Sequence, residues 1–192
     1  MERALVVYAS RHGSTQGIAE RIGEVLRAHG VEAVVVEPAS HAPDPSAFDG
    51  VVVGSGVYMG SWLGEGIEYL ERNVETLAGR KVWLFSSGPL PGSTKEAAPD
   101  ADRYGGALGP AEGPGSGGRH RIEALADAIH VRDHRVFQGA FDPNDGPKSI
   151  AERFVRLMPA AKDILPPGDF RQWDLIEAWA REIAAEITAV PA

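Results

Sequence analysis

Short runs of apolar residues in the first half of the chain predict buried strands. Each run is nearly continuous in apolar residues instead of alternating with polar ones. A continuous run is typical of a strand that is covered on both faces, as in a parallel sheet. The four runs lie at residues 4–8, 31–36, 51–53 and 81–85.

Two segments between these runs have the spacing of amphipathic helices. Apolar residues recur every three or four positions from Thr15 to His29, which places them on one helix face. Gly30 follows at the position where a C-terminal helix cap belongs. The same spacing predicts a second helix from Ile67 to Leu77.

The second half of the chain contains four further predicted elements. Helices are expected over residues 122–129 and 150–158, and a fifth strand over 135–137. A last helix follows the Pro-Pro-Gly sequence at 166–168. Its apolar residues at 173, 176, 179, 183 and 187 form a stripe that we interpret as core packing.

The order of these elements predicts an α/β fold. Alternating strands and helices with short links are typical of a parallel sheet with right-handed crossovers. Fully apolar strands favour a doubly wound sheet with helices on both faces. We therefore expect a five-stranded parallel sheet, and the 192 residues fit a single domain over 1–192.

The segment from 87 to 119 differs from the rest of the chain. Of its 33 residues, 14 are glycine or proline, and it has no apolar periodicity. Such a segment cannot bury enough surface to offset its ordering entropy by itself. We expect a Gly/Pro-rich loop that is mobile or that orders over a ligand.

The amino-acid composition excludes several kinds of functional site. The chain has no cysteine, which excludes disulfides, thiolate metal sites and thiol nucleophiles. Any redox chemistry must then come from an organic cofactor or from a metal on other ligands. The net charge of −8 argues against nucleic-acid binding and is compatible with docking onto basic proteins.

The sequence predicts a cytoplasmic protein. It lacks the basic region and apolar stretch of a signal peptide. No apolar run approaches the roughly 20 residues that span a bilayer. Peripheral contact with a membrane surface is left open, as is a homodimer.

The segment after the first strand has the composition of a phosphate site. Residues 10–15 read Ser-Arg-His-Gly-Ser-Thr and lead into the first predicted helix. Hydroxyls and backbone N–H groups at a helix N-terminus suit a phosphate dianion. An ordinary helix cap with a turn glycine explains the same residues. The segment is neither a Walker A motif nor Gly-x-Gly-x-x-Gly.

Two further segments follow strands at the same edge of the predicted sheet. Residues 54–62 contain three glycines, and Tyr58 and Trp62 offer faces for stacking against a flat ligand. Residues 86–90, Ser-Ser-Gly-Pro-Leu, offer N–H donors and a rigid bend. Ligands bind beyond the carboxyl ends of strands in such sheets, so these segments define one candidate site.

The motifs in these segments resemble those of a known family. Residues 10–15 are similar to the flavodoxin phosphate pattern, with His12 in place of the usual hydroxyl residue. Together with 54–62, 85–90 and Gly-Asp-Phe-Arg-Gln-Trp at 168–173, they resemble a flavodoxin-like FMN-binding subgroup. That subgroup is related to menaquinone-dependent protoporphyrinogen IX dehydrogenase.

The resemblance implies a flavodoxin-like doubly wound sheet that binds FMN as its redox centre. The flavin carries the chemistry, so no side chain is assigned a catalytic role. The implied partners are a redox protein, a quinone or a small-molecule substrate. The implied cofactor-binding residues are Ser10, Arg11, His12, Gly13, Ser14, Thr15, Gly56, Val57, Tyr58, Met59, Gly60, Ser87, Gly88 and Pro89.

Three functions remain open at this stage. The first is an electron carrier with an exposed flavin edge. The second is an enzyme that oxidises protoporphyrinogen IX and passes electrons to menaquinone. The third is a flavin-free binding module on the same fold. A metal site at His130 and His134 is disfavoured, because the predicted helix ends between them.

Overall fold

The computed structural model describes residues 1–37, 42–58, 60–88, 116–142, 146 and 167–189. The predicted helix at 150–158 lies outside these residues, as does most of the Gly/Pro-rich segment. None of the helices within the described ranges is long and apolar enough to cross a bilayer.

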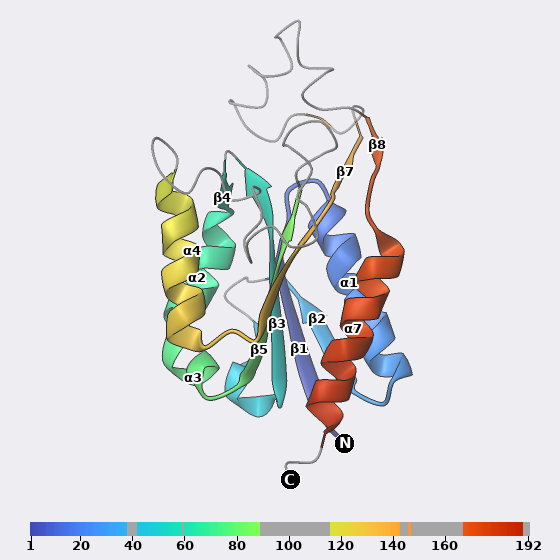
Figure 1. Ribbon diagram of the computed structural model, residues 1–192, viewed down its shortest axis with the longest axis vertical. Coiled ribbons are helices and arrows are strands. Elements are labelled where there is room, and N and C mark those ends of the chain that lie inside the picture. Colours follow the sequence, from blue (N-terminus) through green and yellow to red (C-terminus); the bar gives the residue numbers. More distant parts are fainter. Residues whose placement is uncertain (38–41, 59, 89–115, 143–145, 147–166, 190–192) are drawn as a thin grey trace, which may run out of the picture.

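Five parallel strands form the centre of the fold. They are β1 (Arg3–Ala9), β2 (Glu32–Val36), β3 (Gly50–Tyr58), β5 (Lys81–Ser87) and β6 (Asp133–Phe137). They lie in the order β2-β1-β3-β5-β6 (Figure 1), which confirms the predicted five-stranded parallel sheet. A short strand, β4 (Ser61–Trp62), pairs antiparallel with the end of β3.

Helices cover both faces of this sheet (Figure 1). One face carries α1 (Ser14–Ala28) and α7 (Trp173–Thr188). The other face carries α2 (Gly64–Arg72), α3 (Val74–Ala78) and α4 (Ser116–Ile129). A 3-10 turn at Pro45–Ala47 precedes β3.

The alternation of side chains along β1 builds one core on each face of the sheet. Ala4 and Val6 pack toward α1 and α7, whereas Leu5 and Val7 pack toward α2 and α4. All four are fully buried, as a strand covered on both faces requires. The predicted stripe on α7 is confirmed as core at Ile176, Trp179, Ile183 and Ile187.

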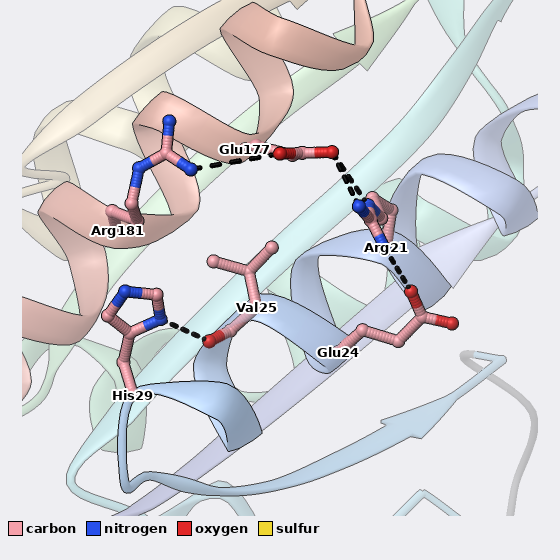
Figure 2. A network of polar contacts seen from close by, with 6 residues as sticks. All are labelled: Arg21, Glu24, Val25, His29, Glu177 and Arg181. Carbon is pink, nitrogen blue, oxygen red and sulfur yellow. Dashed lines mark hydrogen bonds and ion pairs between the residues drawn. The ribbon is translucent and has the colours of Figure 1, made fainter.

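An ion pair between Arg21 and Glu177 joins α1 to α7, and each partner forms a second ion pair within its own helix (Figure 2). The guanidinium of Arg21 donates to Glu177 at 2.6 Å and to Glu24 at 2.7 Å. Arg181 lies 3.7 Å from the other oxygen of Glu177. Hydrogen bonds from Arg21 hold the pKa of Glu177 below its ordinary value, so this carboxylate stays charged when α7 is docked.

The predicted helix from Ile67 to Leu77 is wrong, because two helices occupy this segment. Asn73 ends α2 with φ −114° and ψ 12°, and α3 starts at the next residue. The side chain of Asn73 donates to the carbonyl of Tyr69 at 2.8 Å. The apolar spacing continues across the break, so the periodicity alone did not reveal it.

Two strands are longer than the sequence predicted. β3 runs to Tyr58, so residues 54–58 are strand where we expected a loop. Gly54 still pairs with Phe85, and Gly56 with Ser87. The predicted loop from 87 to 119 is also wrong at both ends, since β5 includes Ser87 and α4 begins at Ser116.

The segment before α7 forms a small sheet that we did not predict. β7 (Ala140–Phe141) pairs antiparallel with β8 (Gly168–Asp169). The N–H of Phe170 donates to the carbonyl of Gly139 at 3.1 Å. Both strands lie beyond the carboxyl end of the central sheet (Figure 1), and so they border the candidate site.

Candidate functional site

The three predicted site segments meet at the carboxyl edge of the sheet. The hydroxyls of Ser14 and Ser87 lie 3.4 Å apart, which joins the first segment to the third. A side chain at Gly56 would place its first carbon 3.2 Å from Oγ1 of Thr15, which joins the first to the second. The site lies at the ends of the adjacent strands β1 and β3, where the strand order changes direction. Sheets of this type bind ligands at that switch point.

The segment between β1 and α1 is a tight turn that opens the helix. Gly13 occupies the N-cap with φ 77°, a left-handed conformation that favours glycine. Its N–H donates to the hydroxyl of Ser10 at 3.1 Å. The first helical bond runs from the N–H of Gly17 to Gly13 at 2.9 Å. The preceding N–H groups of the first turn have no acceptor within the helix.

The hydroxyl of Ser14 forms part of the frame of the site. It accepts a hydrogen bond from the N–H of Ala140 at 2.9 Å. A side chain at Gly139 would place its first carbon 3.3 Å from the same oxygen. Because Oγ accepts from Ala140, its own proton remains available to Ser87 or to a ligand. No local sequence pattern indicates this contact with the segment after β6.

Thr15, the last residue of the predicted phosphate segment, is buried with 2% of its surface exposed. It faces Gly56 instead of solvent.

Two buried serines anchor the hairpin that carries Tyr58. Ser55 Oγ accepts from the N–H of Leu63 at 3.0 Å. Ser86 Oγ accepts from the indole N–H of Trp62 at 2.8 Å. Trp62 is only 3% exposed, so its interpretation as a stacking face for a ligand is wrong. Tyr58 is half-buried and is left as the aromatic residue of this segment.

The same serine connects the hairpin to β6. Ser86 Oγ lies 2.9 Å from Nε2 of His134, which is 4% exposed. Because the indole of Trp62 donates to this oxygen, the serine hydroxyl can donate to the imidazole. The ring of Trp62 also meets that of His134 edge-on at 6.0 Å. His134 is therefore a structural residue beneath the site.

Two glycines with positive φ lie where the hairpin at 54–62 approaches the end of β5. Gly60 turns the hairpin with φ 76°, and Gly88 ends β5 with φ 90°. A side chain at Gly88 would begin 3.9 Å from the carbonyl oxygen of Val57. The N–H of Gly88 donates to Phe137 at 3.0 Å. The remaining predicted residues, Met59 and Pro89, lie outside the described part of the chain.

Two cationic or titratable side chains of the first segment lie against the hairpin. The guanidinium carbon of Arg11 is 5.1 Å from the ring centre of Tyr58. The ring of His12 is 6.4 Å from that of Tyr58 and tilted by 39°. Arg11 is exposed and His12 half-buried. The segments at 10–15, 56–60 and 86–88 contain no acidic residue.

The segment at 168–173 packs against α1 at the border of the site, through the side chain of Arg171. Arg171 forms two hydrogen bonds to Asp169, at 2.8 and 2.6 Å, and these hold the pKa of Asp169 below its ordinary value. The guanidinium also stacks on Trp173 at 4.5 Å. It lies so close to Gly17 of α1 that a side chain there would collide with it.

Comparison with known proteins identifies the same architecture. A family model described as a flavodoxin domain matches residues 5–142. A flavodoxin from the domain Archaea is 16% identical over 97% of this chain and 99% of its own, with a TM-score of 0.59. Oxidised Flavodoxin 2 from Bacillus cereus is 20% identical over 96% and 99%, with a TM-score of 0.56. No curated protein matches the sequence.

Proposed function

Because this chain belongs to the flavodoxin-domain family, we propose that it binds FMN at the carboxyl edge of the sheet and that the bound flavin transfers electrons. The single observation that carries the proposal is the meeting of the three segments at 10–15, 56–58 and 86–88 at the β1/β3 switch point. In a sheet of this order, that is the place where FMN binds.

The start of α1 suits the phosphate of FMN. Its first-turn N–H groups have no helical acceptor, and the helix dipole favours an anion there. A side chain on Gly13 would meet no atom of the described residues within 4 Å, its chain neighbours aside, so these residues leave space for a ligand beside the helix N-terminus. The hydroxyls of Ser10 and Ser14 can supply further donors.

The hairpin and the end of β5 suit the ring system. Tyr58 offers an aromatic face of the kind that stacks on flat ligands. A side chain at Gly56 would begin 3.1 Å from the Tyr58 ring and displace it, so glycine preserves the position of this aromatic residue. Gly88 leaves backbone close to the same hairpin, which allows N–H groups to approach the ring edge.

The bound flavin supplies the electron transfer, and the protein supplies binding and orientation. The N–H groups of the first turn of α1 hold the phosphate. Ser86 and Ser55 keep the hairpin in place from below. No side chain is assigned a proton-transfer step. We propose, as the first candidate, that the protein is a cytoplasmic electron carrier that exchanges electrons with a protein partner through this flavin.

A second candidate is the oxidation of protoporphyrinogen IX with menaquinone as acceptor. It is favoured by the position of the segment at 168–173, which carries part of the resemblance to that subgroup. This segment pairs with residues 139–141 beside Ser14, so it borders the proposed flavin site. Anaerobic assay of the FMN-loaded protein with both compounds separates the two candidates, since a carrier leaves the porphyrinogen unchanged.

Substitution of Ser10 tests the phosphate site. Ser10→Asp keeps an acceptor for the N–H of Gly13 but adds a charge that repels phosphate, which is expected to weaken FMN binding about 100-fold. Ser10→Asn keeps an acceptor without the charge and is expected to bind FMN within a few-fold of the unchanged protein. Equal affinities for the two variants would contradict the assignment.

A further inference from the structure

Arg11 links the proposed phosphate segment to the proposed ring-binding hairpin. Its backbone lies in the turn between β1 and α1, and its guanidinium lies over the ring of Tyr58 at 5.1 Å. A cation at this distance is attracted by the electron-rich aromatic face. The attraction keeps the guanidinium of this exposed side chain against the hairpin.

The charge of Arg11 stands out against the rest of the protein. The whole chain carries a net charge of −8, yet the segments at 10–15, 56–60 and 86–88 contain no Asp or Glu. Salt screens exposed charges beyond about 8 Å at physiological ionic strength. Within these three segments, the charge that lies against the hairpin is that of Arg11, and it is positive.

A flat ligand at Tyr58 would lie next to this guanidinium. The ligand either takes the opposite face of the tyrosine ring or replaces the guanidinium on its face. In both cases the side chain of Arg11 starts beside the hairpin, because its backbone lies two residues before the N-cap Gly13. The ring-binding part of the site therefore presents a positive charge to a ligand at Tyr58.

The charge of Arg11 acts differently on oxidised FMN and on fully reduced FMN. Full reduction adds two electrons and, near neutral pH, one proton, which leaves the ring system with one negative charge. A neighbouring cation stabilises that state and has little effect on the neutral oxidised ring.

We propose that Arg11 makes the site bind reduced FMN more tightly than it otherwise would, and so raises the midpoint potential of the bound flavin. The inference rests on the proposed FMN function. It offsets the effect of the acidic surface, which favours the oxidised form. The site is thereby poised to accept electrons from a donor.

The test compares charge-removing and charge-keeping variants at this position. FMN is titrated into each purified protein, and the two-electron midpoint potential of the loaded protein is measured by anaerobic reduction with dithionite. The variants are Arg11→Gln, Arg11→Lys and, as a control for net charge, Arg181→Gln on the exposed side of α7 (Figure 2).

Arg11→Gln is expected to weaken binding of reduced FMN about tenfold more than binding of oxidised FMN. That ratio corresponds to a fall of about 30 mV for a two-electron couple. Arg11→Lys and Arg181→Gln are expected to keep the potential of the unchanged protein. A fall of similar size in Arg181→Gln would attribute the effect to net charge and overturn the inference.

Two further results separate failure of the Arg11 inference from failure of the proposed FMN binding. If Arg11→Gln weakens both states of FMN equally, or neither, Arg11 does not set the potential, and the inference fails while FMN binding stands. If the unchanged protein takes up no FMN, the proposed function fails, and the inference fails with it.

Discussion

The hydroxyl of Ser14 accepts a hydrogen bond at 2.9 Å from the N–H of Ala140, a residue 126 positions later in the chain. This contact fixes the first turn of α1 against the segment that follows β6. Ser87 at the end of β5 lies 3.4 Å from the same oxygen. One side chain therefore holds together three separate parts of the site border.

Replacing Ser14 tests whether this contact supports both the fold and the ligand site. Ser14→Ala removes the acceptor of a half-buried N–H group, which is expected to reduce the free energy of unfolding by about 1 kcal/mol. That loss corresponds to a fall in Tm of about 2–4 °C for a chain of this size. FMN affinity should fall as well.

Gln16→Ala is the matched control, because Gln16 lies in the same helical turn and its side chain donates to the exposed Glu20 of its own helix. Thermal unfolding and FMN titration measure both variants. Equal unfolding temperatures for Ser14→Ala and Gln16→Ala would show that the contact with Ala140 has no structural importance.

The buried hydroxyl of Ser86 is predicted to be essential for the hairpin. Ser86→Ala leaves the indole N–H of Trp62 and Nε2 of His134 without this partner. Loss of a buried partner costs about 1–3 kcal/mol, which urea unfolding can measure. Ser61→Ala serves as the control, since the Ser61 hydroxyl makes a longer bond of 3.3 Å to Trp62. Similar stabilities for the two variants would contradict the prediction.

The aromatic ring of Tyr58 is predicted to contribute to flavin binding. Tyr58→Ala removes the stacking face and is expected to weaken FMN binding about tenfold, the scale of aromatic stacking. Tyr58→Phe keeps the ring and should bind nearly as well as the unchanged protein. Quenching of FMN fluorescence measures both affinities. A Tyr58→Ala variant with unchanged affinity would remove Tyr58 from the site.

Tyr69 gives a prediction about alkaline stability that is independent of any ligand. It is 1% exposed, and among the described residues its hydroxyl has no hydrogen-bond partner. Burial raises the pKa of this phenol to about 12. The unfolded chain loses the proton near pH 10, so the native state is progressively disfavoured as the pH rises from 10 toward 12.

Tyr69→Phe removes both the unpaired hydroxyl and this titration. At pH 8 the variant should be as stable as the unchanged protein, or more stable by about 1 kcal/mol. Between pH 10 and 12 its advantage should grow by about 1.4 kcal/mol per pH unit. Urea unfolding of both proteins at pH 8 and pH 11 provides the comparison. An advantage that stays constant with pH would contradict the assignment.

The sheet could be predicted from the sequence because its strands are covered on both faces. Val51, Val52 and Val53 form a continuous apolar run, which is typical of a strand in a parallel sheet. The stripe on α7 was equally clear, since Ile176, Trp179 and Ile183 recur at helical spacing and are all buried.

The details of the site could not be predicted, because they depend on contacts between distant strands. Trp62 reaches Ser86 across 24 positions, and Ser86 reaches His134 across 48. Neither separation leaves a local pattern. From the sequence alone Trp62 is therefore expected to stack on a ligand, whereas its buried indole is hydrogen-bonded to Ser86. The two-residue strands β7 and β8 are too short to have a detectable periodicity.

Titration of the purified protein with FMN and with riboflavin, which lacks the phosphate, tests the proposed flavin site directly. Absorbance and fluorescence changes give the affinity for each. A phosphate held by charge-assisted hydrogen bonds at the start of α1 predicts one FMN bound per chain, about 100-fold more tightly than riboflavin. Equal affinities would contradict the phosphate site, and binding of neither compound would contradict the proposed function itself.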